Sequence, residues 1–266
     1  MRGISARSLE EVLVAVDGAQ GDSAGLGTQL FGVVGLLDAN PALRRVLTDP
    51  STESDAKAGL AATVLGSRVD AGTVQVVRTA AAARWNAGRD LADALELAGA
   101  AAVVGRADAA GALEQLETEL FEVGRAVAND VELRGVVADR SYPAQAKAEL
   151  LGRLFGSQVS TETLELVQQA VAARTGSFEK TLTAFGEVAA QRRDRAVAVV
   201  RVAYELSDDE RTRLASALAT KYGRDVHLNV VVDPTVVGGI SVSLGGEVVD
   251  GTMSSRLETA RRRLAG

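Results

Sequence analysis

Apolar residues recur every three or four positions through much of the first two hundred residues. The stripes are clearest in two places, at Leu30, Val33, Val34 and Leu37, and again at Leu120, Val123 and Val127. This spacing places apolar side chains on one face of an α-helix, so it predicts helices that bury one side and expose the other. The pattern therefore predicts helical bundles for this part of the chain.

The two stripes belong to an internal duplication. Residues 30–84 and 120–174 align without a gap at a constant offset of 90, with 21 identities in 55 positions. Five identities are alanines, which composition alone could supply. The other 16 include Leu30 with Leu120, Phe31 with Phe121, Leu43 with Leu133, Arg44 with Arg134, Asp49 with Asp139, Lys57 with Lys147 and Arg84 with Arg174. This self-similarity predicts two copies of one helical substructure.

Residues that start and end helices coincide in the two copies. A serine or aspartate accepts hydrogen bonds from free N–H groups at a helix start, and glycine commonly ends a helix. The equivalent pairs are Ser51 and Ser141 at the start of a short capped helix, the second with Pro143 in its first turn, Gly66 and Gly156 at its end, and Asp70 and Ser160 at the start of the next helix.

Residues 90–109 contain no cluster of turn-forming residues, and they follow the first copy directly. We expect a helix that is shared between the two bundles or bridges them. Gly99, Gly105 and Gly111 are its weak points, because glycine costs up to about 1 kcal/mol relative to alanine in a helix interior. A break at these glycines is the alternative.

From residue 195 the pattern changes to short strands. Residues 196–204 and 225–232 are rich in β-branched, apolar residues. The segment between them opens with a capping box, Ser207 with Glu210, and ends at Gly223, so it predicts a helix between two strands.

The last stretch of the chain predicts a β-hairpin followed by a helix. Ile240, Val242 and Leu244 alternate with serines as a strand would, and glycines 245 and 246 suit a two-residue turn before a return strand at residues 247–250. Helical spacing then returns over residues 253–264. The hairpin is expected to complete a sheet with the two preceding strands, and its inward side chains are expected to hold the terminal helix.

These patterns predict a mainly α protein with a C-terminal α/β module. Two tandem helical bundles would be followed by a small domain of sheet and helices. The predicted domains are residues 1–105 for the first copy, 106–194 for the second copy and 195–266 for the α/β module.

Composition narrows the possible classes of function. The 266 residues are 47% hydrophobic but only 3% aromatic, which suits helices packed through alanine, leucine and valine better than an aromatic-lined ligand pocket. A net charge of −6 argues against an electrostatic nucleic-acid binder. The chain has no cysteine, so disulfides, thiolate nucleophiles and thiolate metal sites are excluded. We expect no direct insertion into a membrane, because no apolar run approaches about 20 residues.

Candidate catalytic groups are few. His227 is the only histidine, and its place in a predicted strand favours a structural role over that of a base or ligand. The carboxylates at 208–210 lie at a predicted helix start, where they compensate the helix dipole. The glycine-rich stretches lack the sequence of a phosphate-binding loop, and Trp85 is expected to pack between helices. We therefore predict no catalytic residues, no metal site and no cofactor.

Arginines cluster at two predicted helix ends, residues 192–195 and 261–263. Cations there stabilise the C-terminal end of a helix dipole, and a solvated face is the simpler interpretation. A surface for a carboxylate-rich partner is the alternative.

The segment from Val226 to Leu264 resembles the C-terminal signature of the ATP synthase delta subunit family, which includes the oligomycin-sensitivity-conferring protein. The matching residues are Asp233, Pro234, Val237, Gly238, Gly239, Val242, Gly245, Asp250, Gly251, Thr252, Arg256 and Leu257. Ser243 departs from the charged or amide residue usual in the family. The resemblance extends upstream to about Ala110, and the additional N-terminal copy resembles the longer actinobacterial form.

The resemblance implies a non-catalytic stator subunit of the rotary, proton-translocating ATP synthase. Its helical domain would sit on the catalytic head and hold amphipathic N-terminal helices of the alpha subunits. The C-terminal module would hold b-type subunits of the peripheral stalk. Localisation would be peripheral, at the cytoplasmic face of the cell membrane. A stand-alone helical-repeat scaffold for protein interactions is the alternative, and a small-molecule enzyme is a further one.

Overall fold

The computed structural model describes residues 3–19, 25–172, 174, 176–195, 197–222, 226–233, 236, 239–244 and 247–250. The chain forms two compact units, Met1–Ala189 and Ala190–Gly266. The first unit is helical, and the second unit contains a sheet. This division agrees with the predicted class of a mainly α protein with a C-terminal α/β module.

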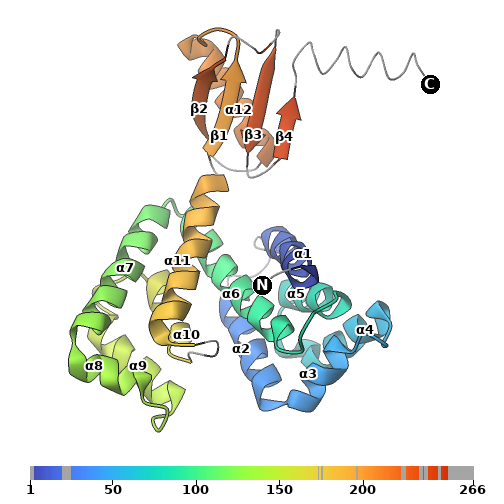
Figure 1. Cartoon of the computed structure of the whole chain (residues 1–266), viewed down its shortest axis with the longest axis vertical. Helices are drawn as coiled ribbons and strands as arrows, with labels where there is room; N and C mark the ends of the chain where they lie inside the picture. The colour runs from blue at the N-terminus through green and yellow to red at the C-terminus, as the bar shows by residue number, and fades with distance from the viewer. Residues whose placement is uncertain are drawn as a thin grey trace. The chain divides into compact units, whose positions relative to one another are not determined.

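Four helices of the first copy, α2 to α5, have counterparts 90 residues later in the second copy, α7 to α10 (Figure 1). The first copy has α1 (Ile4–Ala19), α2 (Leu26–Ala39), α3 (Pro41–Thr48), α4 (Ser54–Leu65), the short 3-10 helix η1 (Gly66–Arg68) and α5 (Ala71–Ala82). The second copy has α7 (Leu113–Asn129), α8 (Val131–Ala138), α9 (Ala144–Phe155), α10 (Thr161–Ala170) and α11 (Phe178–Arg195). At the offset of 90, α3 and α4 coincide with α8 and α9 residue for residue, which confirms the predicted duplication.

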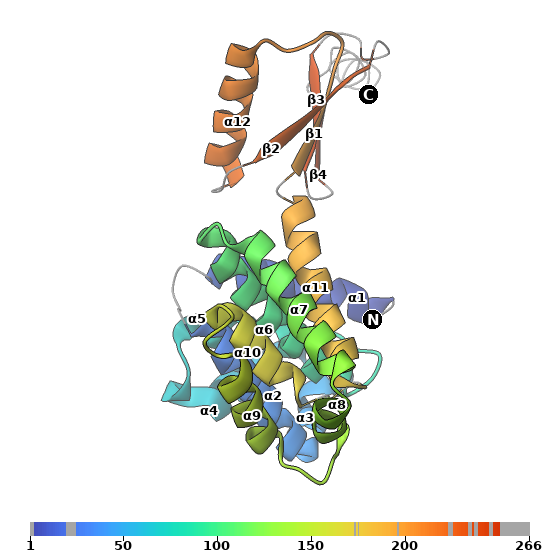
Figure 2. The same ribbon diagram turned by 90° about the vertical axis from the view of Figure 1, so that its left-hand side faces the viewer.

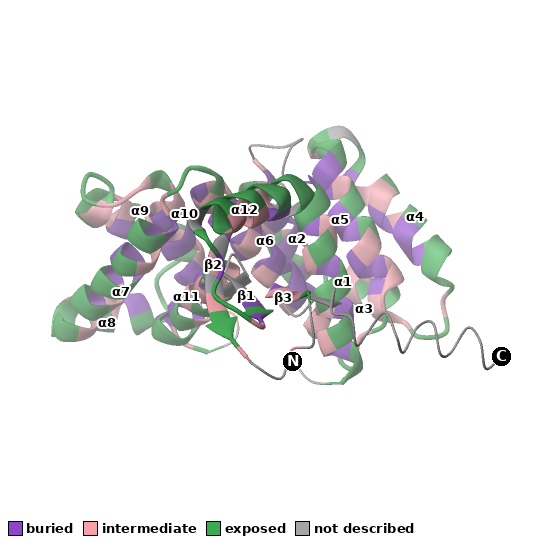
Figure 3. Ribbon diagram, turned by 90° about the horizontal axis from the view of Figure 1, so that it is seen from above, coloured by how far each residue is buried: buried purple, intermediate pink, exposed green. Residues whose placement is uncertain are grey.

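Each copy has its own hydrophobic core, and α6 (Asp90–Ala109) contributes to both. Leu91 and Leu95 of α6 are buried in the first core, whereas Val103 and Val104 are buried in the second. Figure 1 shows α6 running between the helices of the first copy and those of the second. Buried residues line α2 and α6 in Figure 3. The shared helix is thus confirmed.

The predicted alternative of a break is wrong at Gly99 and Gly105, through which α6 runs without interruption, and is confirmed at Gly111. The helix ends just before Gly111, which has a φ of +69° that suits glycine. Neighbouring helices stabilise α6 from both sides, so its two internal glycines do not interrupt it. The domain boundary predicted at residue 105 falls inside this helix. The folding of each copy as a separate domain therefore stays a prediction.

The predicted helix ends are confirmed at Gly66 and Gly156, which both follow the last residue of their helices, although only Gly66 has a positive φ, of +52°. The predicted starts at Ser51 and Ser141 are wrong. The backbone N–H groups of these serines donate to Asp49 and Asp139, 2.8 Å away in each copy, in turns that precede the helix. The helices then begin three residues later, after Glu53 and Pro143, which occupy the N-cap positions.

The second unit contains a four-stranded sheet with strand order β2-β1-β3-β4 (Figure 1), and Figure 2 shows the sheet from its edge with a helix on one face. Its elements are β1 (Val197–Val202), α12 (Asp208–Tyr222), β2 (His227–Val232), β3 (Ile240–Leu244) and β4 (Glu247–Asp250). β1 pairs with β2 in parallel and with β3 antiparallel. The predicted hairpin is confirmed by the antiparallel pairing of β3 with β4, in which Val242 lies opposite Val249.

α12 supplies the apolar cover for this sheet. Leu214 and Leu218 of the helix pack with Val200, Val242 and Leu244 of the strands. The predicted capping box is present: Ser207 Oγ donates to the Glu210 carboxylate at 2.8 Å, and the Glu210 N–H donates back to Ser207 Oγ at 3.4 Å. The turn at glycines 245 and 246, the helix end at Gly223 and the terminal helix predicted over residues 253–264 lie outside the described residues.

Candidate functional site

The two copies are joined by an aromatic contact on α2. Phe31 projects from α2 onto the core of the second copy, where its ring centroid lies 6.4 Å from that of Phe185 on α11. α6 makes room for this ring with a glycine. A Cβ atom on Gly99 would lie 2.6 Å from Phe31 Cε1, closer than carbon atoms approach one another. Gly99 therefore serves close packing of two helices, which the sequence presented only as a weak point.

A second close approach lies one turn earlier on α2. A Cβ atom on Gly27 would lie 2.5 Å from Val103 Cγ2 of α6. Beside it, Thr28 Oγ1 donates a hydrogen bond of 2.6 Å to Glu165 of α10. Glu165 also accepts from Arg106 of α6 at 2.7 Å, so three helices meet through one carboxylate.

The densest ionic contact of this joint surrounds Arg174, which follows α10. Its guanidinium forms ion pairs with Asp38 of α2 and with Asp93 and Glu96 of α6, the last two at 3.1 Å and 3.3 Å. The side chain of Arg174 is 11% exposed and that of Glu96 is 5% exposed. One buried cation thus links the first copy, the shared helix and the second copy.

Burial and charge act in opposite directions on the acids of this cluster. Burial raises the pKa of Glu96, while the amide of Gln169, which donates to it at 2.9 Å, and Arg174 lower it. The hydrogen bonds from Arg174 hold the pKa of Asp38 below its ordinary value. Burial by itself would lower the pKa of Arg174, but the three carboxylates outweigh this effect and raise the pKa. Arg174 therefore stays a cation.

Each copy contains the same polar clamp between its first long helix and the start of its α5 or α10 helix. In the second copy, Glu119 Oε2 accepts from the hydroxyls of Ser160 and Thr163, both at 2.6 Å. Burial raises the pKa of Glu119, but these donors outweigh it and lower the pKa. Ser160 also accepts from the N–H of Thr163, which confirms it as an N-cap.

In the first copy Gln29 takes the place of Glu119. Its Oε1 accepts from the N–H of Asp70 at 2.8 Å and from Thr73 Oγ1 at 2.7 Å, and its Nε2 donates to the Asp70 carboxylate. Asp70 holds the N-cap position but makes no capping hydrogen bond with its side chain. The carboxylate of the clamp therefore belongs to the N-cap residue Asp70 in the first copy and to the long-helix residue Glu119 in the second. Each clamp still pairs a hydrogen-bond donor with an acceptor.

Both copies also bury a lysine. Lys57 Nζ donates to the carbonyl of Ala83 at 3.2 Å, and Lys147 Nζ donates to that of Val137 at 2.9 Å. Burial, aided by the charge of Arg84, lowers the pKa of Lys57, and Asp49 opposes this effect. Each lysine donates to a carbonyl at the C-terminal end of a neighbouring helix, α5 for Lys57 and α8 for Lys147.

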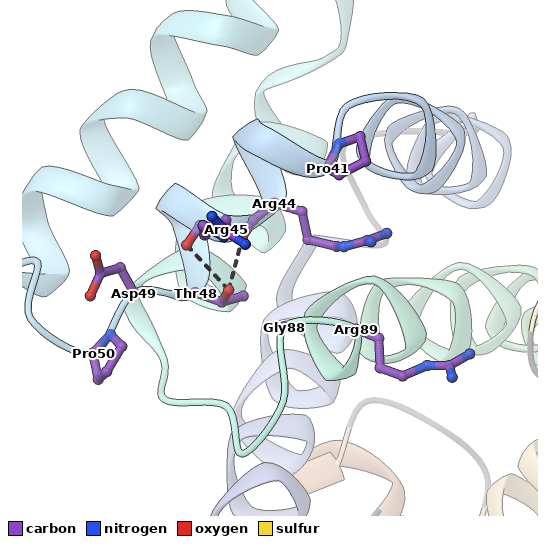
Figure 4. A pocket seen from close by; sticks show the side chains of 8 residues that line it. All are labelled: Pro41, Arg44, Arg45, Thr48, Asp49, Pro50, Gly88 and Arg89. Carbon is purple, nitrogen blue, oxygen red and sulfur yellow. Dashed lines mark hydrogen bonds between the residues drawn. The ribbon is translucent and has the colours of Figure 1, made fainter.

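Two hollows lie at equivalent places in the copies. The first, of about 490 Å³, is lined by Pro41, Arg44, Arg45, Thr48, Asp49, Pro50, Gly88 and Arg89 (Figure 4). The second, of about 280 Å³, includes Arg134, Ala138, Arg140, Phe178 and Glu179 at the corresponding positions. Figure 4 shows the side chains of Arg44 and Arg89 extending in the same direction. They form ion pairs with Asp38 and Asp93, respectively, so these cations belong to the joint around Arg174.

The predicted signature residues that the structure describes gather at one end of the C-terminal sheet. Asp233 follows β2 and donates its N–H to the carbonyl of Val202 at 2.8 Å. Gly239, with a φ of +94°, precedes β3, and Asp250 lies opposite Ser241 at the end of β4. The other predicted signature residues, Pro234, Gly238, Gly245, Gly251, Arg256 and Leu257, lie outside the described residues.

The described residues offer structural contacts where catalytic groups would be sought. His227 lies in β2 opposite Val197 of β1. Trp85 packs against the first core and donates from Nε1 to the carbonyl of Ala80 at 2.8 Å, which confirms its packing role. In the described part of the chain, no group of three histidine, aspartate or glutamate residues is placed to hold a metal, and no helix is long and apolar enough to span a membrane.

Sequence reasoning missed Arg174 as a residue of the joint and Glu119 as the acceptor of the clamp within the second copy. The alignment paired Arg174 with Arg84, but Arg84 is exposed, and the partners of Arg174 come from helices distant in sequence. The sequence shows the same residue, arginine, at both positions. Only the folded chain reveals that their surroundings differ.

Two tandem helical copies that share α6, followed by a small α/β unit, define the class of a mainly α protein with a C-terminal α/β module. Comparisons with known proteins make this class specific. Residues 99–264 match the family described as ATP synthase delta (OSCP) subunit. The chain belongs to this family, whose members are non-catalytic subunits of the ATP synthase complex.

Curated relatives named ATP synthase subunit delta align over nearly the whole chain. The protein of Streptomyces griseus is 43% identical over 98% of this chain and 97% of its own length. That of Kineococcus radiotolerans is 43% identical over 98% and 95%, respectively. The protein of Thermobifida fusca is 41% identical over the full length of both chains. The additional N-terminal copy is therefore present in these relatives as well.

Proposed function

We propose that the chain links the catalytic head of the ATP synthase to its peripheral stalk and resists the torque between them. The helical unit would receive amphipathic N-terminal helices of the alpha subunits, and the C-terminal unit would receive the b-type stalk subunits. The complex would place the chain at the cytoplasmic face of the cell membrane, without a membrane-inserted segment of its own. Family membership over nearly the full chain is the observation that carries this proposal.

The helical unit has apolar positions that a partner helix could cover. α1 buries Val12 and Val16 against the first core, yet its Ile4 and Val14 are 56% and 71% exposed. An amphipathic helix laid along such a surface would bury its own apolar face. The exposed residues of α1 therefore support a role in helix capture.

Resistance to torque needs elements that do not bend at their joints. α6 belongs to both cores, and the Arg174 cluster ties α2 to α6 with charged hydrogen bonds. A continuous helix and a buried ionic contact both oppose rotation of one copy against the other. This construction supports a stator role for the helical unit.

The test separates binding to the head from binding to the stalk. Replacing Gly246 by Val would place a β-branched residue at a turn where positive φ is predicted, at a cost on the order of 1–2 kcal/mol. We expect this variant to keep its helical unit and its affinity for the head but to lose the stalk. ATP hydrolysis by the head would then be uncoupled from proton movement.

Ser243→Val is the matched control, because it adds the same side chain to the extended backbone of β3. Both variants would be assayed with purified head and purified stalk subunits. Loss of head binding with stalk binding intact would mean that the two ends are assigned in reverse. Failure of the wild type to bind either partner would favour the stand-alone scaffold.

The purified chain should hydrolyse no ATP by itself, because its sequence contains neither a phosphate-binding loop with its lysine nor a candidate general base in a motif. We also expect no bound cofactor. Turnover that rises with the purity of the preparation would contradict this expectation.

A further inference from the structure

The hollow of the second copy combines buried apolar side chains with exposed arginines. The buried apolar residues that line it are Val127, Val137, Val171 and Phe178. Its basic residues are Lys147, which is buried, and Arg134 and Arg140, which are exposed. Glu179 is the one acid among the lining residues. The lining therefore carries an excess of positive charge over an apolar floor.

The acids closest to these arginines in the lining or along the chain are engaged by other groups. Each of them accepts hydrogen bonds from its own turn or helix start. They are Glu179, with Ser177; Asp139, with Ser141; and Asp130, with the N–H groups of Glu132 and Leu133. Within the described residues, none of these acids forms an ion pair with Arg134 or Arg140. The two arginines thus line the hollow without a carboxylate partner of their own.

The first copy shows which group an arginine takes at this position. Arg44, the repeat equivalent of Arg134, forms an ion pair with the carboxylate of Asp38 at 3.0 Å. In the second copy Ala128 stands at the position of Asp38. Arg134 Nη1 donates instead to the carbonyl of Ala128 at 2.7 Å. A neutral carbonyl has therefore replaced the acid on which the first copy relies.

Arg134 keeps most of its hydrogen-bonding capacity after this contact. A guanidinium has five N–H donors in a planar fork that matches the two oxygens of a carboxylate. The bond to the Ala128 carbonyl uses one of these donors. Because Arg140 lines the same hollow, a carboxylate that enters it is attracted by both arginines.

The size of the hollow favours a side chain of another polypeptide over a free small molecule. Its volume of about 280 Å³ lies below the range of about 300–1,000 Å³ that is usual for small-molecule pockets. Clusters of arginine are a recurrent means of binding acidic peptide motifs. The chain belongs to a family of subunits of a larger complex, so its neighbours there are polypeptides.

We propose that the hollow of the second copy binds an acidic peptide segment of another ATP synthase subunit. An aspartate or glutamate carboxylate of that segment contacts Arg134 and Arg140, and an apolar side chain beside it lies on the floor of the hollow. This inference rests on the proposed function, because it takes the partner from the same complex. The hollow is lined by residues of α7, α8, α9 and α11, whereas the exposed apolar residues expected to receive a partner helix lie on α1. Failure of one contact would therefore leave the other standing.

Carbodiimide crosslinking of the assembled complex tests the proposal. The reagent joins an amine to a carboxylate as an amide and takes up the water that is released, so it adds no spacer and reports direct contact. A guanidinium does not react in this way, and Arg134→Lys therefore introduces the reactive amine while keeping the positive charge. We expect this variant to crosslink to an aspartate or glutamate of another subunit, next to an apolar residue, as identified by mass spectrometry.

Arg44→Lys is the matched control, because Asp38 supplies its carboxylate within the same chain. It should crosslink to Asp38 both in the isolated chain and in the complex. Three outcomes in an intact complex would overturn the proposal while the control reacts. Position 134 could give no crosslink, it could react only with acids of its own chain, or it could react with a second copy of the chain. Each outcome counts against this hollow and leaves the stator role standing.

A binding measurement with the crosslinked segment as a synthetic peptide complements this result. Arg134→Gln should raise the Kd about tenfold, as expected for the loss of a hydrogen bond to a charged group. Arg153→Gln is the control, because it removes an exposed arginine of α9 that does not line the hollow, and it should leave the Kd unchanged. Both variants should unfold at the urea midpoint of the wild type, because both side chains are exposed. Equal Kd values for the two variants would refute the assignment.

Two small anions, inorganic phosphate and valerate, test whether the hollow is instead a site for a free ligand. Valerate has a carboxylate and a short apolar chain, so it presents the same chemistry without a peptide. We expect neither anion at millimolar concentration to change the urea midpoint of the isolated chain. A rise in the midpoint of the wild type that is absent from Arg134→Gln would identify a small-molecule site and overturn the proposal of a peptide partner.

Discussion

Replacement of Arg174 by glutamine tests whether the ionic cluster holds the two copies together. The change would leave Glu96 without its cation and Asp93 with only the exposed Arg89, and the side chains of these acids are only 5% and 19% exposed. Breaking a buried ion pair by removing one partner costs about 3–5 kcal/mol. Asp38 is 36% exposed and contributes less. We therefore expect Arg174→Gln to lower the free energy of unfolding by about 2–4 kcal/mol at neutral pH.

The pH dependence of this loss is determined by the sign of the pKa shift. Burial already raises the pKa of Glu96 in the folded chain, and loss of Arg174 would raise it further. A carboxyl group whose pKa is raised in the folded state lowers the free energy of unfolding at high pH. This loss is absent below the unfolded-state pKa of about 4.3, and it grows until the pH exceeds the folded-state pKa. The difference between wild type and variant should thus be largest near pH 7.5 and shrink toward pH 5.

Trp85 provides the assay. It is the single tryptophan, and it packs against the first core, so its fluorescence in a urea titration reports unfolding of the helical unit. Arg84→Gln is the matched control, since Arg84 is the repeat equivalent of Arg174 and is exposed. Its effect should stay within about 0.5 kcal/mol. Adding Glu96→Gln to the Arg174 variant should restore part of the stability, because it removes the uncompensated charge.

Equal losses for the Arg174 and Arg84 variants would refute the reasoning. So would a loss for Arg174→Gln that does not change between pH 7.5 and pH 5. The first result would mean that the cluster contributes no net stability, and the second would mean that Glu96 does not sense the arginine.

Two further predictions concern the duplicated elements. Gly99→Ala should destabilise the helical unit by about 1–2 kcal/mol, because the new Cβ would meet the ring of Phe31. Gly59→Ala on α4 is the control, and it should stabilise the unit by up to about 1 kcal/mol, because a Cβ there has nothing within 4 Å. Equal effects of the two changes in urea unfolding would contradict the close approach. Glu119→Ala should cost about 1–3 kcal/mol by leaving the buried hydroxyl of Thr163 without this acceptor, and Glu119→Gln should cost less. The same loss for both variants would show that the clamp does not depend on an acceptor at this position.

The duplication could be predicted without the structure, because it is encoded locally. Leu30, Val33 and their equivalents 90 residues later show helical spacing, and each buries in the core of its own copy. Gly66 and Gly156 end their helices as predicted. The capping box at Ser207 is also a local signal, since its hydrogen bonds join residues three apart. Such features follow from short-range sterics and hydrogen bonding, which a sequence displays directly.

The errors came from competing local possibilities. Ser51 and Ser141 are good N-cap residues, but Asp49 and Asp139 engage them first in turns, and the helices begin three residues later. Gly99 was a possible break because its cost in a helix is local, whereas the packing of Phe31 against it is not. A local rule gives the tendency of a segment, and its tertiary neighbours decide whether that tendency prevails.

The sequence by itself thus determined the class of fold, the two copies, the hairpin and the family. Only the tertiary structure decided that α6 continues through Gly99 and Gly105, that Arg174 rather than Arg84 holds an ionic cluster, and that Phe31 is packed while Phe121 is exposed. The physical reason is that the members of each repeat pair have the same side chain but different neighbours. Burial and charge pairing depend on residues distant in sequence, so identical residues acquire different roles once the chain folds.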